Sequence, residues 1–241
     1  EKNPKLYYKN NVLGTKSVLL ACKDTSVKNF IFSSTAAVYK DKQKIVNERS
    51  IIKPKSVYGK TKIKAEKLVI SKCKTLGINY AILRYFNVCG ASISGKIGLI
   101  ASTDSLFKNI SLAVVKKKPI IKIYGNDYNT HDGTAVRDYI HVSDLAELHF
   151  KILNKISMTN KSTILNCGYH RGISVTEVLN EFKKQTKKDI NILYKKRRIG
   201  DLAIVIANNK KLKKTINWFP KYSSLSLIVK SCIRWEKIIN R

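Results

Sequence analysis

The chain has 241 residues, of which 44% are hydrophobic and 9% aromatic, and its formal net charge is +31. This composition excludes wholesale disorder, and no run of 18 apolar residues exists that would predict a membrane span. The charge would ordinarily suggest a nucleic-acid or anionic membrane partner. However, the 47 basic residues include only 8 Arg, and the lysines are spread along the whole chain. Because phosphate and base readers favour the arginine fork, we interpret the charge as compositional bias and expect neither nucleic acid nor membrane as a partner.

The five cysteines are odd in number, scattered and without a CxxC pair. This usage favours reduced thiols over a disulfide framework, so we expect a cytoplasmic protein. The four histidines show no HExxH or Cys/His metal spacing, and we expect no metal site.

The first predicted elements alternate between helix and strand. Residues 4–22 open with Pro4 and predict a mostly buried helix, and residues 28–34 carry a short apolar run typical of a buried strand. Residues 57–75 then predict a second helix that Gly77 would close, and residues 79–84 another buried strand. This order indicates an α/β protein with a parallel sheet.

After residue 90 the pattern loosens. We predict a helix over 104–117, a strand over 119–124, a loop over 125–136, and helices over 143–155 and 174–187. These elements indicate a smaller α/β region interleaved with the sheet.

A glycine-rich phosphate-binding turn is absent from the sequence. A dinucleotide-binding fold normally opens with a strand, such a turn and a helix, whereas this chain opens with a predicted helix and contains no GxGxxG. The segment Gly90–Ile97 matches only the GxxxxGK part of a nucleotide-binding loop, because Ile97 replaces the hydroxyl that would bind Mg²⁺.

Tyr58 and Lys62 form a Tyr-x-x-x-Lys pair on the predicted 57–75 helix. Positions i and i+4 share one helix face, and a nearby ammonium lowers the pKa of a phenol, which would make Tyr58 a usable general base. With twelve tyrosines and so many lysines, roughly two such pairs are expected by accident, so the pair alone carries no weight. Its context matters more. Ser33 and Thr35 lie at the end of the 28–34 strand, and ligands of open α/β sheets bind beyond the carboxyl ends of strands.

Six segments together resemble the extended short-chain dehydrogenase/reductase family, and within it most closely the UDP-glucose 4-epimerases. They are Asn10–Thr15, Phe32–Tyr39, Ser56–Lys62, Arg84–Asn87, Arg197–Asp201 and, most specific, Ile123–Leu145. The resemblance runs from residue 3 to about residue 236. It implies the C-terminal part of a Rossmann-type, doubly wound parallel sheet with an interleaved smaller α/β substrate domain. Residues 1–87 and 139–170 would form an incomplete NAD-binding domain, and residues 88–138 and 171–241 a nucleotide-sugar-binding domain.

The resemblance also implies a role for individual residues. Thr35, Tyr58 and Lys62 would be catalytic, with Thr35 also contacting the substrate. The NAD cofactor would be bound by Asn11, Ser33, Tyr58, Lys62, Tyr85 and Phe86. The substrate would be bound by Asn87, Ser105, Tyr124 (lining the uracil), Arg137 and Arg198 (holding the diphosphate) and Asp201 (binding the ribose hydroxyls). A guanidinium fork matches two phosphate oxygens, and a carboxylate accepts from a diol.

The implied function is NAD-dependent epimerisation at C4 of a UDP-hexose through a 4-keto intermediate. Helices 4–22 and 57–75 would pack in a homodimer, as the corresponding helices do in the family. Roughly the first 90 residues of the family pattern are missing, so we expect a fragment that alone neither holds NAD nor epimerises. Val205 stands where some family members carry a bulky Tyr, which suggests tolerance of 2-N-acetyl sugars.

Three alternatives stay open at this point. A different family reaction, such as 4,6-dehydration, would need an acidic pair beside the catalytic hydroxyl, and Ala36-Ala37 follows Thr35 instead. A basic nucleic-acid-binding protein would gather its Lys and Arg on one face. A remnant without activity would retain only the fold or the dimer contacts.

Overall fold

The computed structural model describes residues 3–41, 43–100, 105–116, 120–198 and 201–240. The chain divides into two compact units. The first consists of residues 1–86, 147–168 and 207–219, and the second of residues 87–146, 169–206 and 220–241. This division differs from the expected domain boundaries, because residues 207–219 lie in the first unit and residues 139–146 in the second. The functional assignment of the two regions stays a prediction.

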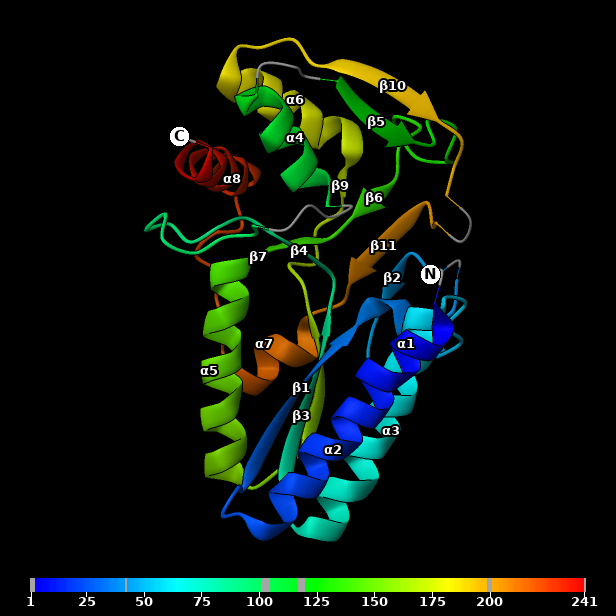
Figure 1. Ribbon diagram of the computed structural model, residues 1–241, viewed down its shortest axis with the longest axis vertical. Coiled ribbons are helices and arrows are strands. Elements are labelled where there is room, and N and C mark those ends of the chain that lie inside the picture. The colour runs from blue at the N-terminus through cyan, green and yellow to red at the C-terminus, as the bar shows by residue number, and fades with distance from the viewer. Residues whose placement is uncertain (1–2, 42, 101–104, 117–119, 199–200, 241) are drawn as a thin grey trace. The chain divides into compact units, whose positions relative to one another are not determined.

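The first unit is built on a three-stranded parallel sheet. Its order is β1 (Asn29–Thr35), β3 (Asn79–Tyr85), β8 (Thr163–Cys167), and the register places Thr35 and Tyr85 side by side at the carboxyl ends. The sheet lies between α3 (Val57–Leu76) on one face and α5 (Val142–Thr159) on the other (Figure 1). The unit also contains the 3₁₀ turn η3 (Ala36–Val38), the short strand β2 (Ile45–Val46) and the helix α7 (Lys210–Ile216).

The boundaries of α3 follow from its end residues. The Ser56 side chain accepts a hydrogen bond from the Gly59 amide at 2.9 Å, and Gly77 ends the helix in the left-handed region with φ +65°. The buried face of α3 includes Ala65, Val69 and Cys73, which pack on the sheet. The strands predicted over 28–34 and 79–84 and the helix over 57–75 are therefore confirmed to within two residues.

The prediction of one mostly buried helix over 4–22 is wrong in two respects. The segment forms α1 (Pro4–Tyr8), a π-helical turn η1 (Lys9–Leu13), α2 (Gly14–Ala21) and the 3₁₀ turn η2 (Cys22–Asp24). Only Val12 and Leu19 are buried. Leu6, Leu13 and Leu20, seven residues apart, are exposed along with Tyr8 and Val18.

The second unit contains three small groups of strands. β4 (Asn87–Cys89) pairs in parallel with β7 (Tyr139–His141), and β5 (Ile120–Tyr124) in parallel with β10 (Asn191–Lys195). β6 (Val136–Arg137) lies between β11 (Ile204–Ala207) and β9 (Ile173–Ser174). The described residues of the unit also form the helices α4 (Leu106–Val115), α6 (Val175–Thr186) and α8 (Leu225–Ile239).

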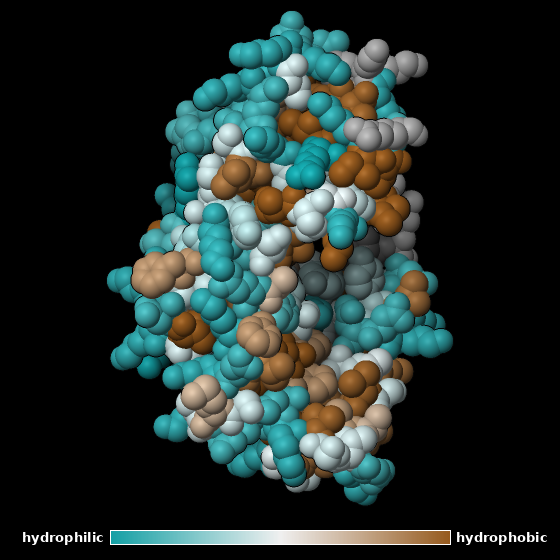
Figure 2. Space-filling view, turned by 90° about the vertical axis from the view of Figure 1, so that its left-hand side faces the viewer, coloured by the Kyte–Doolittle hydropathy of each residue, from teal (hydrophilic) through white to brown (hydrophobic). Residues whose placement is uncertain are grey.

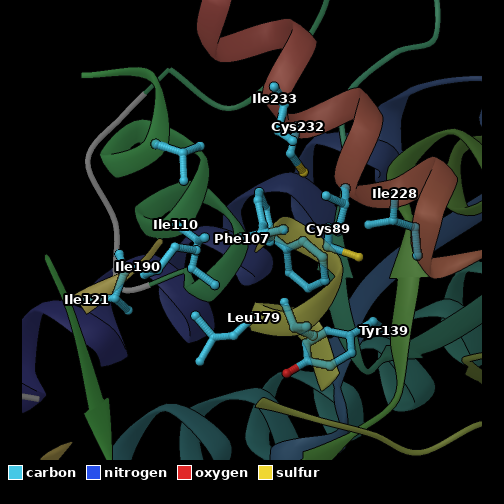
Figure 3. Close-up of a cluster of buried hydrophobic side chains, with 14 of the residues drawn as sticks. Cys89, Phe107, Ile110, Ile121, Tyr139, Leu179, Ile190, Ile228, Cys232 and Ile233 are labelled. Carbon is cyan, nitrogen blue, oxygen red and sulfur yellow. The ribbon is translucent and has the colours of Figure 1, made fainter. Parts of the chain in front are cut away.

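The core of the second unit lies among its helices and β5. Phe107 of α4, Phe182 of α6 and Ile228 of α8 meet there, with Tyr139 packed edge-on against Phe107. Figure 3 shows these elements contributing Ile110, Leu179, Cys232 and their neighbours to one cluster. Ser174 and Glu177 form a capping box that fixes the start of α6. The predicted helices 143–155 and 174–187 are confirmed. The helix predicted over 104–117 is confirmed over Leu106–Val115 and the strand over 119–124 over Ile120–Tyr124, while residues 104, 117 and 119 lie outside the described residues.

Hydrophobic side chains also reach the surface of α5. Phe150 is 66% exposed and Met158 84% exposed. Figure 2, which views the molecule from the α5 side, shows hydrophilic residues over much of this face, with hydrophobic residues between them. No helix in the described part of the chain is both long and apolar enough to cross a bilayer.

Candidate active site

Tyr58 and Thr35 come together at the carboxyl end of β1. The Tyr58 hydroxyl is hydrogen-bonded to the Thr35 side chain, and the ring packs edge-on against Tyr7, with 6.3 Å between the centroids. Thr35 is the last residue of β1, and its hydroxyl also accepts from the Ala37 amide at 3.2 Å. Because Tyr58 lies in the first turn of α3, the helix start and the strand end together fix this pair.

Close packing at Gly59 determines how near α3 comes to η3, the turn that follows β1. A Cβ at this position would lie 2.4 Å from the Ala37 carbonyl oxygen and 2.9 Å from the Pro54 Cβ. Only glycine fits there without moving backbone, so the Tyr-Gly dipeptide is a structural requirement for the contact between Tyr58 and Thr35.

The expectation that Lys62 lowers the pKa of Tyr58 is not met in this structure. Burial raises the pKa of Tyr58, the hydrogen bond from Thr35 lowers it in part, and Tyr7 raises it further. The Lys62 ammonium lies over the Phe32 ring, 4.4 Å from its centroid. Burial lowers the pKa of Lys62 itself, against an opposing effect of Glu66. Tyr58 and Lys62 share one face of α3, but the ammonium lies over the Phe32 ring of β1.

A hydroxyl network extends from this strand end to α5. Ser33 Oγ lies 2.7 Å from the Tyr85 hydroxyl, which lies 2.5 Å from His149 Nε2. Burial raises the pKa of Tyr85 to about 12, and the Ser33 hydrogen bond opposes that shift. His149 is not among the residues predicted for the site. Its partner Tyr85 is 64 positions away, so no local spacing indicates the contact.

Asn11 is held against α3 from the π-helical turn. Its side-chain amide donates to Thr61 Oγ1 at 2.9 Å, and Thr61 donates to the Tyr58 carbonyl at 2.8 Å. The π-helical turn and the first turn of α3 are therefore linked through Asn11, and such turns occur frequently at functional sites.

A buried ion pair ties α3 to the sheet below the Tyr58–Thr35 pair. Arg84 on β3 donates from Nε and Nη2 to the two carboxylate oxygens of Glu66 on α3, at 3.0 and 2.7 Å, and both side chains are at most 2% exposed. Ser34 donates to the same carboxylate at 2.5 Å, and Tyr39 accepts from Arg84 at 3.0 Å. The negative carboxylate raises the pKa of Arg84 above its usual range despite its burial. This pair fixes α3, and with it Tyr58, on the strands.

In the second unit, the residues expected to bind a nucleotide pair with one another. The Arg198 guanidinium carbon lies 4.2 Å from the centroid of the Tyr124 ring. Arg137 Nη2 lies 3.4 Å from Asp201 Oδ1, and Arg137 also donates to the Val136 carbonyl at 3.0 Å. The two pairs are linked through the backbone, because the Asp201 amide donates to the Arg198 carbonyl at 3.1 Å. Guanidinium, aromatic and carboxylate groups are those that a diphosphate, a base and a ribose would use.

The remaining predicted residues lie on strand or helix ends. Phe86 is buried after β3, and its amide donates to the Cys167 carbonyl at 3.3 Å. Asn87 is exposed at the start of β4, and its amide donates to the Asp138 carbonyl at 2.9 Å. Ser105 is the N-cap residue of α4. Among the described residues, no group of three or more His, Cys, Asp or Glu side chains could hold a metal ion.

Comparison with known proteins agrees with this arrangement. Residues 1–168 match the model of the NAD dependent epimerase/dehydratase family. The chain belongs to that family. A UDP-glucose 4-epimerase of Lactobacillus helveticus is 38% identical over 238 residues, which cover 98% of this chain and 72% of the relative.

Solved structures of family members show the same fold. A UDP-glucose 4-epimerase of Bifidobacterium longum in complex with NAD+ and UDP matches with a TM-score of 0.90 and 32% identity, over 98% of this chain and 71% of that one. A UDP-Glc/GlcNAc 4-epimerase of Campylobacter jejuni matches with a TM-score of 0.81 and 36% identity, over 98% and 73%. The epimerase resemblance and the Rossmann-type α/β fold are thereby confirmed, while the roles of the individual site residues remain predictions.

Proposed function

We propose that this chain carries the catalytic and nucleotide-binding side chains for NAD-dependent epimerisation at C4 of a UDP-hexose. The observation that carries the proposal is the hydrogen-bonded Tyr58–Thr35 pair at the carboxyl end of β1 in a member of this family. Tyr58 would accept the proton of the sugar 4-hydroxyl, and Thr35 would bridge the two by hydrogen bonds. Arg137 and Arg198 would hold the diphosphate, so that the 4-keto sugar stays bound until its reduction.

The side chains around the Tyr58–Thr35 pair fit the nicotinamide end of NAD. Ser33, Thr35, Tyr58 and Tyr85 offer hydroxyl groups, Lys62 offers an ammonium, and the nearby carboxylate of Glu66 is already bound by Arg84. Asn11, Ser33, Tyr58, Lys62, Tyr85 and Phe86 would hold this end. When bound, NAD supplies the hydride chemistry at the sugar C4 carbon. The sequence offers no glycine-rich turn for the pyrophosphate, so we propose that these 241 residues alone do not retain NAD.

The test compares two forms of the protein. One is the 241-residue chain, and the other is this chain joined to the part of the Lactobacillus helveticus relative that it does not cover. We expect NAD to copurify with the joined form only, and the joined form to convert UDP-galactose to UDP-glucose. A joined form that folds and holds NAD but leaves UDP-galactose unchanged would overturn the proposed reaction. Stoichiometric NAD on the 241-residue chain would overturn the second proposal.

Val205 supports a proposal about the sugar. It pairs in register with Arg137 between β11 and β6, and it stands where the family pattern in some members has a bulky Tyr. The smaller side chain leaves room for a 2-N-acetyl group, so the joined form would also act on UDP-N-acetylglucosamine. Substitution Val205→Tyr would remove that activity and retain the activity on UDP-galactose. Rejection of the N-acetyl sugar by the unsubstituted protein would contradict the proposal.

The exposed apolar positions of α1, η1 and α2 support a homodimer. Leu6 of α1, Leu13 of η1 and Leu20 of α2 are all exposed, and apolar side chains that gather on a surface mark contact sites. Packing of these helices and α3 against a second copy would remove them from water.

A further inference from the structure

Two segments of the second unit run side by side where the β5–β10 pair ends. Lys195, the last residue of β10, lies in register with Tyr124, the last residue of β5. The Gly125 amide donates to the Lys195 carbonyl at 2.8 Å. The chain after Lys195 therefore passes along the loop that begins at Gly125, and Figure 1 shows β5 and β10 adjacent in this unit.

Arg197 crosses from one of these segments to the other. Its Nε donates to Asp127 Oδ1 at 2.7 Å, and its Nη2 donates to the Asp127 carbonyl oxygen. Its guanidinium carbon lies 4.3 Å from the centroid of the Tyr128 ring, which is 5% exposed. The Arg197 guanidinium thus donates to two oxygens of the loop and covers one face of the buried Tyr128 ring.

Gly125 allows this close approach. A Cβ there would lie 2.9 Å from the Arg197 Cγ and 2.5 Å from the Tyr128 Cε2, and the backbone has φ +86°. A side chain at position 125 would therefore occupy the space that the Arg197 stem and the Tyr128 ring fill.

The neighbours of this contact are the proposed nucleotide-binding residues. Tyr124 precedes Gly125, Arg198 follows Arg197, and the Arg198 guanidinium lies over the Tyr124 ring. Arg197 itself is turned onto Asp127, so it is not directed at the same ring as Arg198.

We propose that Arg197 is a positioning residue for nucleotide binding, which fastens the segment carrying Arg198 to the loop that follows Tyr124. This inference rests on the proposed function, because it takes Tyr124 and Arg198 as nucleotide contacts. A segment held before the ligand arrives loses less conformational freedom on binding, and the affinity rises accordingly. The alternative is that Arg197 contributes only positive charge to an anion site, in which case Lys would serve equally well.

The first experiment measures UDP affinity by titration calorimetry on the 241-residue chain. We compare the unsubstituted protein with Arg197→Ala, Arg197→Lys and Lys196→Ala, the last removing the same charge from the adjacent position. We expect the Kd for UDP to rise about five- to tenfold in both Arg197 variants and less than about twofold in Lys196→Ala. Asp127→Asn, at an exposed position, removes the charge that Arg197 pairs with and would raise the Kd in the same direction.

These outcomes distinguish an Arg197 that fastens the two segments from an Arg197 that only contributes positive charge. Full affinity in Arg197→Lys, or an equal loss in Lys196→Ala and Arg197→Ala, would overturn the positioning role. An unchanged Kd in Asp127→Asn would count against it in the same way.

A second measurement needs no ligand. Hydrogen exchange of the Gly125 amide, which bonds the Lys195 carbonyl, should quicken at least about threefold in Arg197→Ala and stay unchanged in Lys196→Ala. Unchanged exchange in Arg197→Ala would show that Arg197 does not hold the segment. If the unsubstituted chain binds no UDP, the proposed function fails and the positioning role fails with it, whereas the exchange rate still decides whether Arg197 fastens the two segments.

Discussion

Tyr58 combines a burial that disfavours its phenolate with a hydrogen bond that favours it. Burial raises the pKa of this phenol, and the Thr35 hydroxyl is the group that lowers it. A general base must be deprotonated, so its rate rises with pH through its pKa. With Tyr58 as the proposed general base, Thr35 would therefore set the pH at which the acidic limb of the rate profile falls.

Substitution Thr35→Ala should raise the pKa of Tyr58 further, because the lowering hydrogen bond is lost. In the joined, NAD-holding form, the acidic limb of kcat should move to higher pH, and Thr35→Ser should keep it in place. The measurement is kcat against pH for the three proteins. An acidic limb at the same pH in Thr35→Ala would show that Thr35 does not tune the base.

Gly59 provides a second test at the level of single residues. Gly59→Ala would drive a Cβ into the Ala37 carbonyl and cost about 1–3 kcal/mol of unfolding free energy. The control is Gly14→Ala, where the new Cβ would meet nothing closer than 3.8 Å and would stabilise the helix by about 0.5–1 kcal/mol. Urea unfolding of both variants measures the difference, and equal stabilities would contradict the close packing of α3 on the end of β1.

The element that carries the candidate base is α3, and its attachment was outside the reach of sequence reasoning. The pattern predicted the helix, its Gly77 end and the Tyr58–Lys62 face. It did not reveal that Glu66 and Arg84 form a buried pair, because the two residues belong to different elements and charged residues usually remain on the surface.

Breaking that pair should destabilise the first unit strongly. Glu66→Gln removes the charge that compensates a buried guanidinium, so we expect a loss of about 3–5 kcal/mol of unfolding free energy. Glu147→Gln removes the partly exposed partner of Lys151, 3.1 Å away, and should cost less than about 1 kcal/mol. Thermal or urea unfolding measures both variants. A loss below 1 kcal/mol in Glu66→Gln would mean that Arg84 remains compensated by other groups.

Other elements show where hydrophobic periodicity fails to predict secondary structure or burial. The sequence analysis did not assign β8 or α8, although Leu165 and Ile228 are fully buried in them. β8 is only five residues long and pairs with a strand about 80 positions away, so its signal is mostly non-local. The helix over 4–22 was expected to be buried because its apolar residues are numerous, yet most of them face water in the single chain.

At the scale of the whole molecule, that exposure predicts self-association. Leu13→Lys would place a charge in the proposed helix contact and shift the protein from dimer to monomer. Met158→Lys, at an exposed position of α5, would leave the dimer intact. Light scattering after size exclusion gives the masses. A monomeric unsubstituted protein would contradict the homodimer.

The motifs that resemble the family indicated the class of protein correctly, whereas the charge alone would have indicated a nucleic-acid partner. The charge of +31 would favour a nucleic-acid binder, whereas Ile123–Leu145 and the Tyr58 segment pointed to the epimerases, and the family match and the shared fold agree with them. Charge reflects the whole chain, while chemistry depends on a few residues that the fold brings together.

The most direct measurement is the fate of the hydrogen at C4. The joined, NAD-holding form converts UDP-galactose in D₂O, and the product is examined by NMR or mass spectrometry. We predict UDP-glucose with no solvent deuterium at C4, because the hydrogen leaves and returns without exchanging with water, and conversion at least about a hundredfold slower in Tyr58→Phe. Deuterium at C4, or an undiminished rate in Tyr58→Phe, would contradict the account.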